Sequence, residues 1–381
     1  MALISRVGMI GCGSMGGQIA EWLHRHGVNI VLFDVNEDQA HQLSKRLFAE
    51  NQIECPIAAE LSGLGECDLI IESILEDAVA KSQLFRQLET CIGSSPAIFA
   101  SNTSTIKISE IASQLETPSR LIGTHFFHPV DRRSLVEVIQ SDHSDPPSVE
   151  RARIFLTSVD KQPIVVKDTP GFIVNRLLFP YLAEAMQLLQ NGHMISEVDH
   201  AACDYGMPWG PFELADAIGL DVAYFSAKSL FLELGNRAAM SPILPRLVKK
   251  KAFGKKTGSG FYDYDSKANK GLESPLATEI VAKYVQSPSP IVGTMIERMM
   301  YAVLVEASIL LQEQIVETPA LIDLALVKGL DFPESPRGIF GWAESLGPEN
   351  VVQRLKQLAN LGERFHPTKW LIDQAAAGTF S

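Results

Sequence analysis

Cysteines are few in this sequence, and none stands in an arrangement that binds metal. The five cysteines among 381 residues are scattered, with no C-x-x-C pair and no paired histidines nearby. An odd, dispersed set of this kind suits a reducing compartment and does not make a disulfide framework. We therefore expect a cytoplasmic protein with no metal site.

Long hydrophobic runs are also missing. The longest apolar helical pattern, residues 299–311, is interrupted by Glu306 and is too short to cross a membrane. A strand pattern begins at Arg6, which leaves no room for a secretory signal with its charged, apolar and cleavage-site parts. Neither a membrane segment nor export is expected.

Positive charge is in deficit. Lysine and arginine number 33 against 45 aspartates and glutamates, so the net charge is -12. This charge argues against a general binder of nucleic acid or of anionic membranes. The length exceeds that of one hydrophobic core, so we expect two or three domains. The expected partner is a small molecule or a protein.

Residues 6–34, RVGMIGCGSMGGQIAEWLHRHGVNIVLFD, have the pattern of a strand, a glycine-rich loop, a helix and a second strand. The loop contains G-x-G-x-x-G, and Asp34 ends the second strand at the usual distance for a dinucleotide-binding fold. No arginine follows Asp34 to hold a 2'-phosphate, so the sequence favours NAD over NADP. The expected cofactor-binding residues are Gly11, Gly13, Ser14, Met15, Gly16, Asp34, Glu72 and Asn102.

Further strand patterns follow: CDLIIES, AIFAS, RLIGTHFF, SLVEVI and PIVVK. They predict an open sheet of the Rossmann type, in which ligands bind beyond the carboxyl ends of the strands. Glu72, residues 101–104 and His125 lie at such ends. Glu137 lies within the apolar run 135–139, where a carboxylate needs a partner because its burial is costly.

Six segments in order, SNTST, HFFHP, LVEVI, DTPGFIVNRLL, GPFELADAIGLD and KKTGSGFYDY, resemble the 3-hydroxyacyl-CoA dehydrogenase family along essentially the whole chain. The resemblance implies NAD-dependent oxidation of a 3-hydroxyacyl thioester, or the reverse reduction. It implies His125 as the base, with Glu137 as its partner, and Ser104 and Asn175 as hydrogen-bonding residues at the substrate. Histidine can accept a hydroxyl proton near neutral pH, and a carboxylate can fix its tautomer.

Each of these residues also has a structural alternative. His125 beside aromatic residues would be an ordinary core histidine if the other three were not there. Ser104 is alternatively the N-cap of a helix over KISEIASQL, and Asn175, within a helix, alternatively bonds to backbone.

The second half of the chain contains a repeat. The helical segments NRLLFPYLAEAMQLLQ and ERMMYAVLVEASILLQ align without a gap, and similar segments follow both. The alignment matches Arg176 with Arg298 and Glu184 with Glu306. We therefore expect a Rossmann-type NAD-binding domain followed by two all-α domains related by duplication, with residues 1–170, 171–270 and 285–381. The charged segment SKANKGLESPLATE is the expected linker.

The second copy has Glu297 where the first has Asn175, and no second nucleotide domain precedes it. We expect one active site in each chain. Because two similar apolar faces can close on each other within one chain, we expect a monomer, or a pseudo-dimer within one chain.

Two departures from the family bear on the substrate. His128 stands where the family usually has asparagine, and the short segment between Asp34 and Asp68 has room for one helix and not for the helical arm that holds CoA. A CoA ester is the first hypothesis. A hydroxyacyl group on an acyl carrier protein, docked on basic residues, is the alternative; these residues are Arg132, Arg133, Arg151 and Arg153.

Two other classes of protein are less compatible with the sequence. A 6-phosphogluconate-like hydroxyacid dehydrogenase would need a lysine on the helix that carries Asn175, and the sequence has none there. A non-catalytic binding protein would not need His125, Glu137, Ser104 and Asn175 together, and the sequence has all four.

Overall fold

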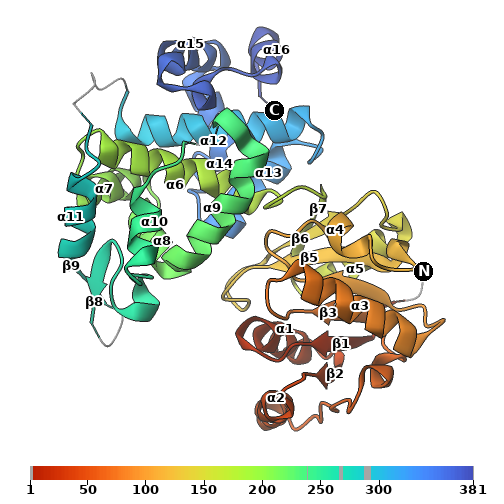
Figure 1. The fold of residues 1–381 in the computed structure, drawn as a ribbon. Helices are drawn as coiled ribbons and strands as arrows, with labels where there is room; N and C mark the ends of the chain where they lie inside the picture. Colours follow the sequence, from red (N-terminus) through yellow and green to blue (C-terminus); the bar gives the residue numbers. More distant parts are fainter. Residues whose placement is uncertain (1–2, 238, 266–268, 287–292, 381) are drawn as a thin grey trace. The chain divides into compact units, whose positions relative to one another are not determined.

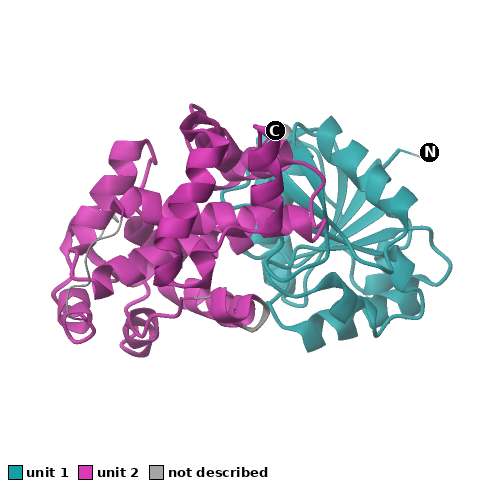
Figure 2. Cartoon of the chain, turned by 90° about the horizontal axis from the view of Figure 1, so that it is seen from above, with its two compact units in different colours: residues 1–172 teal, residues 173–381 magenta. Residues whose placement is uncertain are grey.

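The computed structural model describes residues 3–237, 239–265, 269–286 and 293–380. The chain forms two compact units, Met1–Phe172 and Ile173–Ser381 (Figure 2). The boundary falls two residues after the end of the first predicted domain at residue 170. Within the described residues, no helix is both long enough and apolar enough to cross a membrane.

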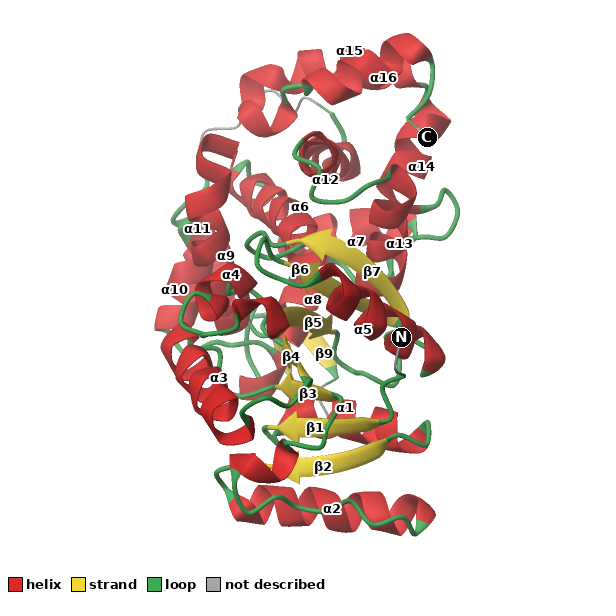
Figure 3. Cartoon of the chain, turned by 90° about the vertical axis from the view of Figure 1, so that its right-hand side faces the viewer, coloured by secondary structure: helices red, strands yellow, loops and turns green. Residues whose placement is uncertain are grey.

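The first unit is built on a seven-stranded sheet with the order β2-β1-β3-β4-β5-β6-β7 (Figure 3). Among the strand pairs of this sheet in the described residues, only β5–β6 is antiparallel. The Rossmann-type prediction is confirmed, and each predicted strand segment contains a strand. The strands are β1 (Arg6–Ile10), β2 (Asn29–Phe33), β3 (Leu69–Glu72), β4 (Ile98–Ser101), β5 (Leu121–Phe126), β6 (Leu135–Gln140) and β7 (Gln162–Lys167).

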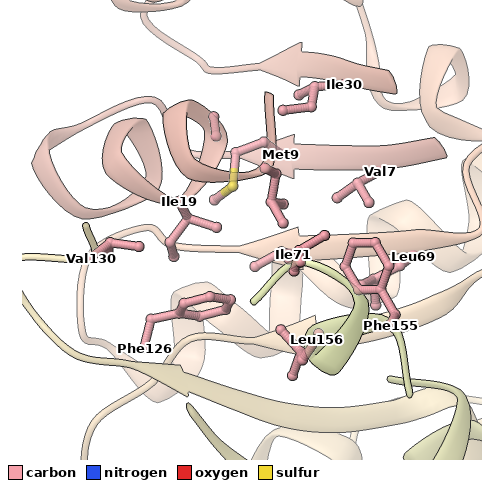
Figure 4. Close-up of a cluster of buried hydrophobic side chains, with 14 of the residues drawn as sticks. Val7, Met9, Ile19, Ile30, Leu69, Ile71, Phe126, Val130, Phe155 and Leu156 are labelled. Carbon is pink, nitrogen blue, oxygen red and sulfur yellow. The ribbon is translucent and has the colours of Figure 1, made fainter. Parts of the chain in front are cut away.

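Helices cover this sheet. They are α1 (Ser14–Arg25), α2 (Glu37–Asn51), α3 (Ala78–Ile92), α4 (Ile108–Ala112) and α5 (Pro146–Ser158), with 3-10 turns η1 (Leu61–Leu64) and η2 (Pro118–Arg120). Ile19 on α1 packs with Met9 and Ile71 of the sheet in a buried apolar cluster (Figure 4). Residues 34–68, all described, contain one α-helix and one 3-10 turn, as their length predicted.

The second unit is mainly helical (Figure 1). Its helices are α6 (Val174–Gln190), α7 (Ile195–Tyr205), α8 (Pro211–Ile218), α9 (Leu220–Leu234), α10 (Ile243–Lys249), α11 (Pro275–Ala282), α12 (Met295–Gln312), α13 (Pro319–Leu330), α14 (Gly338–Leu346), α15 (Pro348–Leu358) and α16 (Lys369–Ala377). Short 3-10 turns are η3 (Gly235–Arg237), η4 (Lys255–Thr257), η5 (Ala359–Leu361) and η6 (Glu363–Phe365). A hairpin of β8 (Tyr262–Tyr264) and β9 (Lys270–Glu273), not predicted from the sequence, adds to these helices.

The two copies of the repeat begin alike. The long helices α6 and α12 lie side by side. Asp199 on α7 accepts hydrogen bonds from the backbone of Phe212 at the start of α8, and Asp323 on α13 does the same for Ile339 at the start of α14. A carboxylate at a helix start satisfies amides that have no partner inside the helix. The same aligned acid therefore sets the same turn in both copies.

The prediction that SKANKGLESPLATE is a linker is wrong for the described part of this segment. Its first three residues, 266–268, lie outside the described residues. Residues 270–273 form β9 and residues from 275 onward form α11. Two contacts anchor the segment, because Lys270 pairs with Glu213 at 2.8 Å and Glu273 accepts the amide of Ser196 at 2.7 Å. Charged side chains of this segment suggested a solvated linker, but Lys270 and Glu273 instead bond to other parts of the second unit.

Candidate active site

The glycine loop between β1 and α1 has backbone that only glycine fits at two points. Gly11 has φ +92°, and a Cβ there would lie 2.5 Å from the carbonyl oxygen of Ser73. A Cβ at Gly16 would overlap the carbonyl oxygen of Gly11. Gly13 is exposed, and a Cβ there would meet only the Gln39 side chain within 4 Å, at an ordinary contact distance of 3.9 Å, so the loop has room on this side. A loop that is tightly packed behind and open at Gly13 fits a dinucleotide pyrophosphate at the start of a helix.

Ser14 and Met15 begin α1. Ser14 is exposed beside Gly13, whereas the half-buried Met15 packs against the apolar cluster of the first unit. Ser14 is exposed and Met15 is half-buried, so the predicted cofactor contacts of both residues remain predictions.

Asp34 holds the glycine loop against the end of β2. Its Oδ2 accepts the amide of Cys12 at 2.6 Å, and its Oδ1 accepts the amide of Asn36 at 2.8 Å. The carboxylate is half-buried, so it can also face a ribose. Burial, with a smaller contribution from Asp34, raises the pKa of the Cys12 thiol to about 12. The loop therefore carries no thiolate that would repel a phosphate.

A groove of about 730 Å³ lies beside the loop, between α1 and α2. Its lining includes both the open face of the loop and basic side chains of α2. The lining residues are Cys12, Gly13, Ser14, Gln18, Glu21, Gln39, Gln42, Leu43, Lys45 and Arg46. The groove is thus large enough, and has the right polarity, to receive a phosphate-bearing ligand.

Glu72, at the end of β3, has no exposed surface. Its carboxylate accepts hydrogen bonds from Lys81 at 2.6 Å, from the Ser101 hydroxyl at 2.6 Å and from the amide of Ile74 at 2.7 Å. These bonds do not test the predicted contact of Glu72 with the cofactor, which remains a prediction. A buried carboxylate needs such partners, so here Glu72 serves to hold the strand ends together.

Asn102 likewise bridges strand ends. Its Oδ1 accepts the amide of Phe126 at 2.9 Å, and its Nδ2 donates to the Ser73 hydroxyl at 3.3 Å. The side chain is 9% exposed. Asn102 thus supports both the loop behind Gly11 and the end of β5, and its predicted contact with the cofactor remains a prediction.

Glu76 holds the SNTST loop that contains Ser104. Its Oε1 accepts the Thr103 hydroxyl at 2.7 Å, the Ser104 amide at 2.9 Å and the Thr105 amide at 3.1 Å. Burial opposes ionisation of Glu76, but the nearby Lys81 ammonium and these donors outweigh it and lower its pKa. Neither Glu76 nor Lys81 was predicted from the sequence as part of the site. The spacing of Glu72, Glu76 and Lys81 across a strand end and the next helix was the signal available.

Ser104 does not cap the helix that follows it. The N-cap position of α4 is Lys107, and the first amides of α4, those of Ile108 and Ser109, bond to the Asp168 carboxylate at 2.9 Å and 2.8 Å. The structural alternative for Ser104 is therefore wrong, because Asp168 takes that role.

His125 and Glu137 meet across the antiparallel pair β5 and β6, where they are register partners. The Nδ1 of His125 lies 2.7 Å from Oε2 of Glu137, and both side chains are buried. The His125 ring also packs against Phe127, with ring centroids 4.4 Å apart, and against Phe172 at 5.8 Å. In the described part of the chain no residue bonds to the Nε2 of His125. The pair therefore has the geometry of an oriented proton acceptor.

The structure does not place Asn175 relative to His125, because Asn175 lies in the first turn of α6 in the second unit. His128 is exposed in the loop after β5. Among the described residues no group of histidine, cysteine or carboxylate side chains has the arrangement of a metal site.

Two models of one protein family match this chain. The model described as the NAD binding domain of 3-hydroxyacyl-CoA dehydrogenase matches residues 6–169. The model described as the C-terminal domain of the same enzyme matches residues 171–264. Together they cover more than half of the chain.

Solved structures are similar as well. The chain is 25% identical to 3-hydroxybutyryl-CoA dehydrogenase from Escherichia coli K12, with 99% of each chain covered and a TM-score of 0.86. It is 32% identical to FadB2 of M. tuberculosis over 69% of this chain and 100% of that one, with a TM-score of 0.65. It is 26% identical to the dehydrogenase part of multifunctional enzyme 1 from C. elegans, over 98% and 90%, with a TM-score of 0.68. The first and third of these similarities extend through both units.

Proposed function

We propose that this chain, which belongs to the 3-hydroxyacyl-CoA dehydrogenase family and is an NAD-dependent oxidoreductase of that type, interconverts a 3-hydroxyacyl-CoA thioester and its 3-ketoacyl form. The observation that carries the proposal for the catalytic residues is the 2.7 Å contact between His125 Nδ1 and Glu137. An ionised carboxylate can only accept a hydrogen bond, so Nδ1 carries the hydrogen and the lone pair lies on Nε2.

In the oxidation, Nε2 of His125 takes the proton of the substrate hydroxyl, and the buried Glu137 carboxylate stabilises the imidazolium that results. In the reverse reaction the imidazolium returns the proton. Bound NAD would accept the hydride from the carbon that bears the hydroxyl. Burial of the pair favours this role, because a charge pair interacts more strongly away from water.

We assign Ser104 to the reacting oxygen and Asn175 to the substrate hydroxyl or thioester carbonyl. The backbone of Ser104 is held by Glu76, which fits a residue that must present its side chain in one position. An amide such as that of Asn175 can stabilise the charge that develops on an oxygen.

For NAD, the loop of Gly11, Gly13 and Gly16 is assigned to the pyrophosphate and Asp34 to the adenosine ribose. Val35, which follows Asp34 in the sequence, and Leu75, in the segment after β3, are 92% and 79% exposed. Such exposed apolar side chains suit contact with a flat, largely apolar ring such as adenine.

The thioester carrier is proposed to be CoA, since the similar E. coli protein is a 3-hydroxybutyryl-CoA dehydrogenase. The carrier-protein alternative is favoured by one observation, the single helix α2 in place of a longer arm after β2. Against it, Arg153 of the proposed docking residues is engaged by Glu150 at 2.7 Å. Comparing kcat/KM for CoA, pantetheine and carrier-protein forms of one hydroxyacyl group tests the choice. A preference for the carrier protein that Arg132→Glu abolishes would overturn the CoA proposal.

His125→Ala tests the chemistry. The expected loss of kcat is roughly 10²- to 10⁴-fold, the usual contribution of a general base, with unchanged NAD affinity. His143→Ala is the matched control, because His143 is exposed in the loop after β6 of the same unit. Near-normal turnover of His125→Ala would contradict the assignment.

One chain is proposed to act as a monomer in the cytoplasm. All five cysteines are free, which suits a reducing compartment. The pairing of α6 with α12 supplies, within one chain, the kind of contact that two identical chains would otherwise make. Sedimentation equilibrium is expected to give the mass of one chain, 41.8 kDa. A stable dimer would contradict this proposal.

A further inference from the structure

The loop between β5 and β6 joins the two strands that carry His125 and Glu137. Val130, in its middle, is 1% exposed. Both backbone groups of Val130 bond to side chains from elsewhere in the unit. Its N–H donates to Oε1 of Gln18 at 3.0 Å, and its carbonyl oxygen accepts from Nζ of Lys161 at 2.5 Å. Two side chains from different parts of the unit therefore hold the loop at this one residue.

Gln18 comes from the cofactor side of the site. It lies on α1, which begins directly after Gly13, and it lines the groove beside the glycine loop. A side chain in the second turn of this helix moves with the amides that would hold the pyrophosphate. Its bond to Val130 therefore joins the phosphate end of the site to the loop that follows His125.

Lys161 comes from the other side, immediately before β7, whose neighbour in the sheet is β6. Its ammonium is buried, also donates to the carbonyl of Arg133 at 2.8 Å, and lies 3.6 Å from the centroid of the Trp22 ring. Trp22 is one turn after Gln18 on α1, and its Nε1 donates to the carbonyl of Val159 at 2.8 Å. Charge-assisted bonds and a cation over an aromatic face are strong local contacts.

We propose that Gln18 and Lys161 are positioning residues. Their two hydrogen bonds to the backbone of Val130, here called the clamp, fix the position of the phosphate-binding end of α1 relative to the His125–Glu137 pair, and this relative position is called the register. The inference rests on the proposed function. In that reaction one substrate loses a hydride to the cofactor and a proton to His125 together, so the relative position of the two acceptors affects the rate. An error of about 1 Å in such a register costs roughly 10²-fold in rate. The clamp makes that register depend on side chains outside the cofactor loop and outside the base pair.

Gln18 offers a sharp test because two replacements separate its effects. Gln18→Leu has similar size and removes the acceptor for the Val130 amide, so kcat is expected to fall roughly 10- to 100-fold with little change in NAD affinity. Gln18→Glu keeps an acceptor for that amide but adds a negative charge beside Gly13 and Ser14. It is expected to restore kcat at saturating NAD while it weakens NAD binding. The matched control is Gln87→Leu, an exposed glutamine on α3.

Hydrogen exchange gives a measurement that does not depend on the substrate. NAD binding is expected to slow exchange of the 127–134 amides in the wild type and to lose this effect in Gln18→Leu. Unchanged kcat in Gln18→Leu together with retained NAD-dependent protection would overturn the clamp. If the wild type shows no 3-hydroxyacyl-CoA turnover, the proposed function fails. The hydrogen-exchange result then decides by itself whether Gln18 couples α1 to the loop of residues 127–134.

Discussion

Glu184 on α6 and Arg298 on α12 form a buried ion pair, with Nε of Arg298 2.6 Å from Oε1 of Glu184. Its counterpart joins Arg176 on α6 to Glu306 on α12 at 2.7 Å. The residues aligned by the repeat thus exchange partners, as equivalent residues do across a two-fold axis. The two copies of the repeat therefore pair in the way that a symmetric dimer would, within one chain.

The loss of Glu184 is expected to be worse than the loss of Arg298. Glu184 also binds Arg364 at 2.6 Å, so Glu184→Leu leaves two arginines without their shared anion, whereas Arg298→Met leaves one pair intact. Breaking a buried pair typically costs about 3 to 5 kcal/mol, and that range is expected for Glu184→Leu. Urea unfolding measures the difference, with exposed Glu279→Gln as the control. An equal or larger effect of Arg298→Met would contradict the prediction.

Glu137→Gln tests the charge of the partner of His125 separately from its shape. The amide oxygen can still accept from Nδ1, but the imidazolium loses its counter-ion. We expect kcat to fall roughly 10²- to 10⁴-fold with the protein still folded. Steady-state kinetics and thermal unfolding are measured together, with half-buried Glu150→Gln as the control. Retained turnover would show that the negative charge is not needed.

Asp34→Ala is expected to weaken NAD binding by about 1.5 to 3 kcal/mol, the scale of hydrogen bonds to a charged group, and to narrow the preference over NADP. Because Asp34 also holds the amide of Cys12, Asp34→Asn is the matched variant. It keeps an acceptor for that amide and removes the charge. Calorimetric titration with both cofactors is the measurement. If the wild type binds NADP as well as NAD, the role given to Asp34 is wrong.

Lys161 gives a pH dependence of stability. Burial lowers its pKa from 10.5 to about 8, with Asp131 acting in the opposite direction. Between these two pH values the unfolded chain holds the proton and the folded chain does not, so the free energy of unfolding rises with pH. Between pH 8 and 10.5, the free energy of unfolding of the wild type should rise by roughly 3 kcal/mol relative to that of Lys161→Met. Urea unfolding at several pH values checks this. A difference in the free energy of unfolding between the wild type and Lys161→Met that stays constant or decreases with pH would refute it.

The local elements of the first unit follow from short-range patterns. The alternation of apolar residues around G-x-G-x-x-G, with Asp34 at the end of the second strand, was enough to predict β1, α1 and β2, because sterics at glycine and helix periodicity act over a few residues. The repeat was visible for the same reason, since Arg176 and Arg298 occupy the same position in two similar helices.

Tertiary structure decided which polar side chains face one another. Glu137 needed a partner by the cost of its burial, and the resemblance named His125, but only the antiparallel register of β5 and β6 places the two in contact. The burial of Glu72 and the strand formed by residues 270–273 were not predictable, because both depend on residues distant in sequence. The same holds for Gln18 and Val130, which are 112 positions apart. Backbone pattern is local, whereas the pairing of buried polar groups is settled only when the packed layers bring their donors and acceptors together.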